Sequence, residues 1–181
     1  MPRLPQIDPG QATGQAKELL HQVQQHLRVV PNMTRAMANS PAVLAGYLAF
    51  SGALQGGALP AKLREQLALA VAEANSCSYC LAAHATIGKM VGLKPADIEA
   101  SRSLDPPDPK ARAALRFAAA VLEGRGEVSD EEFARVREAG FGDAEIAEIV
   151  AHVALNVFTN YFNKAIEVTI DFPPVGTLAT R

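Results

Sequence analysis

Two cysteines and a histidine lie within one stretch of eight residues, CSYCLAAH, and are the residues best suited to chemistry in this chain. They are Cys77, Cys80 and His84. Residues three or four positions apart are neighbours on one face of a helix, and residues seven apart lie about two turns apart on nearly the same side. The spacing therefore predicts that both sulfurs and the imidazole lie along one edge of a helix.

The chemistry that this arrangement favours is thiol redox chemistry. Asn75 and Ser76 interrupt the preceding helical pattern and can cap a new helix from about Cys77, which places the cysteines in its first turn. There the unpaired N–H groups and the helix dipole stabilise an anion and lower the pKa of a thiol. An imidazole one turn away can take the thiol proton, and a second thiol can attack a sulfenic acid to close a disulfide.

A metal site or inert packing could also account for the cysteine pair. A structural zinc site needs four ligands, but the chain has only two cysteines, and the remaining histidines, His21, His26 and His152, are distant in sequence. A structural staple accounts for the pair poorly, because a disulfide that closes so short a loop constrains the unfolded chain little. We therefore favour a redox role and predict neither a metal nor a cofactor.

Composition and charge are those of an ordinary soluble protein. The chain has 181 residues, of which 49% are hydrophobic and 20% charged, and its formal net charge is −2. This charge offers no basic surface for nucleic acid or for an anionic membrane. No signal-peptide pattern is present, and no apolar run reaches the roughly 18 residues that a membrane span requires. We therefore expect a cytoplasmic protein with no nucleic-acid or membrane partner.

The hydrophobic residues recur with the period of helices, and no segment alternates as a strand does. We predict an all-α, compact multi-helix bundle of eight or so helices. It forms a single domain (1–181), with an N-terminal arm and helix (1–30) and a core (40–172). The expected helices cover about 11–30, 33–38, 41–55, 60–74, 77–91, 95–101, 110–123, 130–139 and 143–166.

Several helix ends carry their own signals. Ser40 is a predicted cap with Pro41 at the first helical position, and Ser129 with Glu132 predicts a capping box. Asp143 is the predicted cap of the last helix. The tail from 171 to 181, with two consecutive prolines, is expected to be irregular.

The spacing of Glu65, Cys77, Cys80 and His84 resembles the signature of alkylhydroperoxidase D-like proteins of the carboxymuconolactone decarboxylase superfamily. The segments LREQLALAVAEANSCSYCLAAHATIG and NVFTNYFNKAIEVTIDFP are also similar to that family, so the resemblance covers roughly residues 40–172. It implies an all-helical alkylhydroperoxidase D-like fold with the CxxC at a helix N-terminus. It also implies a homo-oligomer, a trimer or a hexamer.

The resemblance further implies a role for each of these residues. Cys80 would attack the peroxide, Cys77 would resolve the oxidised sulfur, His84 would be the base and Glu65 its proton partner. The implied activity is that of an antioxidant enzyme, a thiol-dependent peroxidase that reduces hydrogen peroxide or organic hydroperoxides. A lipoylated protein or another dithiol would return the electrons.

One position departs from the family pattern. Tyr79 stands where the best-known relative has a relay histidine, and a tyrosine is a poor base near neutral pH. Two alternatives therefore stay open. One is a thiol–disulfide oxidoreductase or redox sensor with little peroxidase turnover. The other is a carboxymuconolactone decarboxylase-like enzyme, although true decarboxylases typically lack the CxxC.

Further polar residues are candidates for supporting the site. Tyr79 can donate a hydrogen bond, and Glu73, four residues before Cys77, is a second acidic candidate beside Glu65. The last long helix carries a polar stripe with helical spacing. Its members are Glu145, Glu148, His152, Asn156, Asn160 and Asn163. We favour a solvent face or a subunit contact for this stripe over hydrogen bonding near the redox site.

Overall fold

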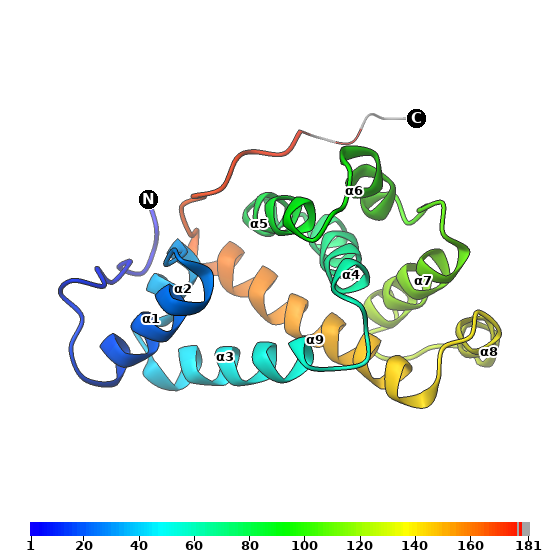
Figure 1. The fold of residues 1–181 in the computed structure, drawn as a ribbon, viewed down its shortest axis with the longest axis horizontal. Coiled ribbons are helices and arrows are strands. Elements are labelled where there is room, and N and C mark those ends of the chain that lie inside the picture. Colours follow the sequence, from blue (N-terminus) through cyan, green and yellow to red (C-terminus); the bar gives the residue numbers. More distant parts are fainter. Residues whose placement is uncertain (177, 179–181) are drawn as a thin grey trace.

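The computed structural model describes residues 1–176 and 178, and this part of the chain contains nine α-helices and no strand (Figure 1). The all-α prediction is therefore confirmed. The helices are α1 (Gly14–Leu27), α2 (Asn32–Met37), α3 (Pro41–Gln55), α4 (Ala61–Ala74), α5 (Ser78–Met90), α6 (Pro95–Arg102), α7 (Pro109–Glu123), α8 (Asp130–Glu138) and α9 (Asp143–Ile166).

Two helices organise the bundle. α4 lies at its centre and contacts α5, α6, α7 and α9. α9 is the longest helix, with 24 residues, and runs from the α7–α8 end of the molecule to the end where α2 and α5 lie (Figure 1). Since α9 also contacts α3, it is covered by neighbours on more than one side.

The main apolar core lies between α4, α7, α8 and α9. Leu67, Leu115 and Ile149 are fully buried there. Alanines of α7 such as Ala114 and Ala118 belong to the same core, so their small side chains bring helices of this chain close together. A second and smaller apolar cluster surrounds the two cysteines.

The helix ends confirm some predicted signals and correct others. Pro41 is the first residue of α3, and Ser129 with Glu132 forms the predicted capping box of α8. The prediction that Asp143 caps α9 is wrong. Gly142 occupies that position, and the Glu145 carboxylate accepts its N–H at 2.8 Å, while the Asp143 carboxylate is paired with Arg137.

The first helix begins at Gly14 rather than at the predicted start near Gln11. A turn precedes it, because the backbone oxygen of Asp8 accepts the N–H groups of Gln11 and Ala12. The helix ends at Leu27, three residues before the predicted end at residue 30, because Arg28 adopts a left-handed backbone conformation (φ 63°) and caps it there.

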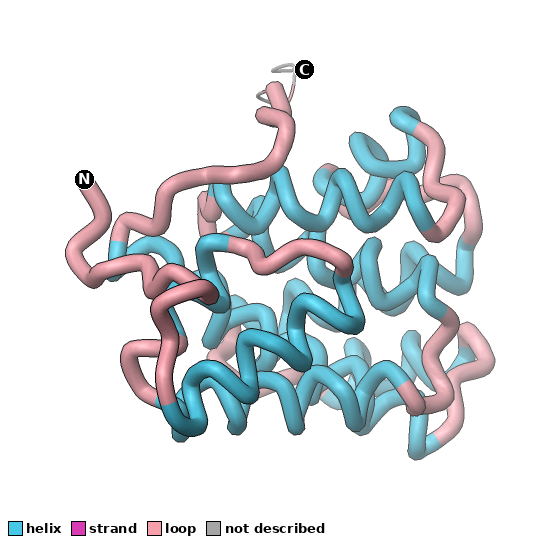
Figure 2. The backbone as a smooth tube through the Cα atoms, turned by 60° about the vertical axis from the view of Figure 1, so that its left-hand side comes forward, coloured by secondary structure: helices cyan, strands magenta, loops and turns pink. Residues whose placement is uncertain are grey.

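The N-terminal arm and the C-terminal tail are the two long loop segments outside the helices (Figure 2). They meet α2 and the end of α9, since Arg3 N donates to Ile166 O and Asn32 N donates to Asp171 Oδ2. Residues 171–176 are irregular, as predicted, while 177 and 179–181 of the predicted tail lie outside the described residues. None of the helices within the described residues has the length and apolarity needed to cross a lipid bilayer.

Candidate redox site

The turn between α4 and α5 fixes where the cysteines lie. Ser76 adopts a left-handed backbone conformation (φ 50°), which few non-glycine residues do, and Cys77 N donates to Ala72 O at 2.9 Å. The chain therefore reverses over two residues, and α5 packs against α4. The predicted interruption at Asn75 and Ser76 is this turn.

Cys77 is itself the N-cap of α5, so the prediction of Asn75 or Ser76 as the cap is wrong. Its Sγ accepts the N–H of Cys80, the third residue of α5, at 3.3 Å. The sulfur thus does what a serine or aspartate oxygen does at most helix starts. The two residues form a disulfide with their Cα atoms 5.3 Å apart. Once reduced, both sulfurs lie where the helix start stabilises a negative charge.

Both sulfurs are buried. Cys77 is 1% exposed and Cys80 is 2% exposed. The apolar cluster around them comes from α2, the end of α4, α5, the end of α9 and the segment that follows it. Its other members include Met33, Ala36, Tyr79, Phe162, Val168 and Phe172. Both sulfurs therefore lie in largely apolar surroundings.

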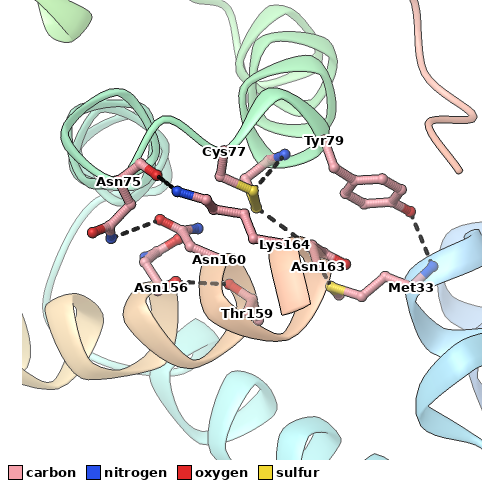
Figure 3. Close-up of a disulfide and its surroundings, with 10 residues drawn as sticks. Met33, Asn75, Cys77, Tyr79, Asn156, Thr159, Asn160, Asn163 and Lys164 are labelled. Carbon is pink, nitrogen blue, oxygen red and sulfur yellow. Dashed lines mark hydrogen bonds between the residues drawn. A yellow bond between two sulfur atoms is a disulfide. The ribbon is translucent and has the colours of Figure 1, made fainter. Parts of the chain in front are cut away.

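Asn163 of α9 contacts the cysteine pair directly (Figure 3). Its side-chain Nδ2 donates to Cys80 Sγ at 3.3 Å and to Met33 Sδ at 3.3 Å. This residue belongs to the polar stripe of α9, and it connects the stripe to the redox site.

The polar stripe is therefore not a solvent face or a subunit contact, and the interpretation that we favoured from the sequence is wrong. Its last four members, His152, Asn156, Asn160 and Asn163, are buried. Of the other two, Glu145 caps α9 and Glu148 accepts the N–H groups of Ala58 and Leu59. The residue types held a signal: an exposed helix face favours Lys, Glu and Arg, whereas asparagine is a poorer helix former.

Two neighbours of Asn163 on α9 hold the turn before the cysteines. Asn160 Oδ1 accepts the side-chain N–H of Asn75 at 3.0 Å, and Lys164 Nζ donates to Asn75 O at 2.6 Å (Figure 3). The helix that contacts Cys80 therefore also fixes the segment leading into Cys77. Sequence reasoning missed Lys164, whose contact with Asn75 joins residues 89 positions apart.

Glu65 and His84 meet between α4 and α5. Glu65 Oε2 lies 2.8 Å from His84 Nδ1, and both side chains are partly exposed. When Nδ1 donates its proton to the carboxylate, Nε2 is the nitrogen left to take or give a proton. His84 follows Cys80 by one helical turn. The structure thus brings together the two residues that the resemblance pairs, and their catalytic roles stay predictions.

The two supporting candidates, Tyr79 and Glu73, have structural partners. The Tyr79 hydroxyl accepts the N–H of Met33 at 3.1 Å. Burial, and less strongly the nearby Asp171 carboxylate, raise the pKa of this phenol, so it stays protonated. Glu73 forms an ion pair with Arg102 at 2.7 Å, between α4 and α6. Within the described residues, no three His, Cys, Asp or Glu side chains are grouped to hold a metal ion.

Comparison with known proteins relates this geometry to a family. The sequence model of the "Carboxymuconolactone decarboxylase family" matches residues 41–120, which hold α3 to α6, most of α7 and both cysteines. None of the curated proteins matches the sequence.

Several solved structures have the same fold. An uncharacterized peroxidase-related protein from Ralstonia eutropha JMP134, described as an alkylhydroperoxidase AhpD core, is 27% identical, with a TM-score of 0.85 over 94% of this chain and 92% of that one. An uncharacterized peroxidase-related protein from Silicibacter sp. TM1040 is 26% identical, with a TM-score of 0.78 over 95% of this chain and 90% of that one. The debrominase Bmp8, solved with 2,3,4-tribromopyrrole, is 21% identical, with a TM-score of 0.75 over 87% of this chain and 86% of that one. At this identity the likeness shows only that the two proteins share a fold.

Proposed function

This chain is an alkylhydroperoxidase D-like protein of the carboxymuconolactone decarboxylase superfamily, and on that premise we propose that it is a thiol-dependent peroxidase. It reduces hydrogen peroxide or organic hydroperoxides. The observation that carries this proposal is the Cys77–Cys80 pair at the start of α5, one turn before a histidine that Glu65 holds.

The first step oxidises Cys80. His84 takes the thiol proton, and the thiolate attacks the peroxide oxygen that carries hydrogen. The S–O bond forms while the O–O bond breaks, and the leaving alkoxide or hydroxide takes a proton from His84. The products are an alcohol or water and a sulfenic acid on Cys80. Glu65 supports both transfers because its contact to Nδ1 fixes the imidazole and stabilises its charged form.

The second step forms the disulfide. The Cys77 thiolate attacks the Cys80 sulfenic sulfur, the S–O bond breaks, and hydroxide leaves as water with the proton of the Cys77 thiol. A lipoylated protein or another dithiol then reduces the disulfide by exchange. We further propose that the protein works as a homo-oligomer, a trimer or a hexamer.

One observation favours a second candidate, a thiol–disulfide oxidoreductase or redox sensor with slow peroxide turnover. Tyr79 lies between the cysteines in sequence, but its hydroxyl is engaged by Met33 and its pKa is raised. It therefore gives the sulfurs no additional base. This candidate predicts a reversible disulfide but negligible turnover with every reductant.

The test is to add peroxide to the reduced protein and to follow both thiols by titration and mass spectrometry. Wild type should lose two thiols per chain and form an intramolecular disulfide. Cys77→Ser should stop at the sulfenic acid on Cys80, and Cys80→Ser should not react at the wild-type rate. Unchanged thiols in the wild type would exclude the peroxidase, and a disulfide without turnover would support the second candidate.

A matched pair of substitutions on α4 tests the role of Glu65. Glu65→Gln should slow the reaction of Cys80 with peroxide by about a hundredfold, a typical worth of acid–base assistance. Glu73→Gln is the control, because Glu73 is an acidic residue of the same helix that pairs with Arg102 instead. Equal rates in both variants would remove Glu65 from the mechanism.

A further inference from the structure

The two sulfurs of the redox pair receive their hydrogen bonds from different sources. Cys77 Sγ accepts a backbone N–H, that of Cys80, and Cys80 Sγ accepts a side-chain N–H, that of Asn163. The backbone donor is present whenever α5 is folded, whatever the side chains are. The donor to Cys80 depends on one residue of α9.

Burial makes this single donor important. Cys80 is 2% exposed and has apolar neighbours, and such surroundings disfavour a charged sulfur. A hydrogen bond to an ionised group is stronger than one between neutral groups. Without Asn163, the backbone N–H of Cys80, which donates to Cys77 Sγ, would favour the thiolate on Cys77, the wrong sulfur for the proposed reaction.

The orientation of the Asn163 amide agrees with a donor role. Its nitrogen faces two sulfurs, Cys80 Sγ and Met33 Sδ, both at 3.3 Å. The reverse orientation would direct the amide oxygen, which only accepts hydrogen bonds, at a thioether sulfur and at the Cys80 sulfur, neither of which can donate a hydrogen bond when Cys80 is in the disulfide or is a thiolate. The amide oxygen has no hydrogen-bond partner among the described residues, so it does not set the orientation.

We propose that Asn163 selects Cys80 as the attacking sulfur by donating a hydrogen bond to its thiolate, an inference that rests on the peroxidase function proposed above. Asn163 is a positioning residue in this reaction: it exchanges no proton and forms no bond with the peroxide. Loss of its donor moves the negative charge from Cys80 to Cys77, which the backbone continues to stabilise.

The test measures each thiol alone, from the ultraviolet absorbance of its thiolate as the pH is raised. Cys77→Ser leaves Cys80, and Cys80→Ser leaves Cys77. Adding Asn163→Leu should raise the pKa of Cys80 by about one unit, the worth of one hydrogen bond to a charged group. The same substitution should leave the pKa of Cys77 unchanged. Equal shifts in the two backgrounds, or no shift at Cys80, would overturn the proposal.

Two further variants separate this effect from general damage. Asn156→Leu is the control, because Asn156 is also a buried amide of α9 but donates to His152 O, so it should not move the pKa of Cys80. Asn163→Asp keeps the side-chain shape and brings a carboxylate to the sulfur, so it should raise the pKa of Cys80 further than leucine does. Both variants keep the ionisable side chains of the surrounding elements, namely Arg35, Glu65, Tyr79, His84, Lys164 and Asp171.

The intact pair gives a second readout. With limiting iodoacetamide, reduced wild type should be alkylated mainly at Cys80, and Asn163→Leu mainly at Cys77, as mass spectrometry can show. Neither measurement uses peroxide. If the thiol pKa values shift as expected but neither thiol reacts with peroxide, the peroxidase proposal fails, and the proposal that Asn163 favours the thiolate on Cys80 stands. If peroxide oxidises Cys80 at equal rates in wild type and in Asn163→Leu, the proposal for Asn163 fails while the peroxidase proposal stands.

Discussion

The two halves of α9 bury different kinds of side chain: those of the first half are apolar except His152 near its end, and those of the second half are polar. The first half, residues 143–155, places Ile146, Ile149 and Val153 in the main apolar core. The second half, residues 156–166, buries polar side chains beside the turn and the disulfide. These are Asn156, Thr159, Asn160 and Asn163. One helix thus serves the core at one end and the candidate site at the other.

The difference between the halves shows that burial alone does not reveal what a segment contributes. Buried apolar side chains stabilise the fold in proportion to the area removed from water. Buried amides cost free energy unless they are hydrogen-bonded. Among the described residues of α9, one buried polar atom of the first half, His152 Nε2, and two of the second half, Asn160 Nδ2 and Asn163 Oδ1, have no hydrogen-bond partner, so the cost of unpaired polar groups falls mainly on the second half. Two of its buried amides, Asn160 and Asn163, contact the turn before Cys77 and the sulfur of Cys80, so they contribute to the geometry of the cysteine pair.

The largest effect on stability should come from the first half. Ile149→Ala removes a fully buried side chain from the main core and should lower the free energy of unfolding by about 2–5 kcal/mol. The pKa values of the two thiols should not move, because Ile149 contributes to that core and not to the cluster around the sulfurs. Denaturant unfolding and thiolate absorbance measure the two quantities.

Val150→Ala is the matched control for this substitution. Val150 is the next residue of α9 but is 42% exposed, so its loss should change stability by no more than about 0.5 kcal/mol. A large loss at Val150, or a shifted thiol pKa in Ile149→Ala, would contradict the division of α9 into two halves.

Asn160→Leu should show the opposite profile. It removes the hydrogen bond to Asn75 and should cost about 1 kcal/mol of unfolding free energy. Disulfide formation should slow several-fold, because the turn before Cys77 loses one of its two side-chain contacts with α9. Stopped-flow oxidation and denaturant unfolding test this. A loss of stability as large as that of Ile149→Ala, with normal oxidation, would show that the polar half also serves the core.

The features that could be predicted from the sequence are those that depend on residues close together in the chain. The helices, the break at Asn75 and the capping box of Ser129 depend on residues that lie close together in the chain, and the structure has all of them. The family resemblance paired Glu65 with His84, and the two are in contact. Helix type follows from such short-range signals, and helix ends do so only in part, since the predicted cap of α9 and the predicted start of α1 are wrong.

The sequence could not predict what depends on distant contacts. The stripe of α9 has the spacing of a solvent face, and its burial depends on helices that pack around α9 from other parts of the chain, namely α3, α4, α5 and α7. Asn163 meets a cysteine that precedes it by 83 positions. Cys77 as its own cap was missed for another reason, since the side chains that usually cap helices are those of Ser, Thr, Asp and Asn.

His152, where the two halves of α9 meet, should show the smallest effect, and only as a dependence on pH. Burial, and after it the positive charge of Arg64, lower the pKa of His152 from 6.5. The unfolded chain therefore binds a proton near pH 6.5 that the folded chain does not yet bind. The contribution of neutral His152 to stability is complete above that pH and is lost as the pH falls below it.

The variant His152→Leu cannot bind this proton, so its stability should fall less than that of the wild type between about pH 7.5 and pH 5. Unfolding by denaturant at a series of pH values measures the difference between the two proteins. The measurements at high pH serve as the control. Above about pH 7.5 histidine is neutral in both the folded and the unfolded chain, so the difference in unfolding free energy between wild type and His152→Leu should be constant there. A difference that stays constant down to about pH 5 would mean that His152 takes up its proton as easily in the fold as in the unfolded chain. The junction of the two halves would then be open to water, contrary to its burial.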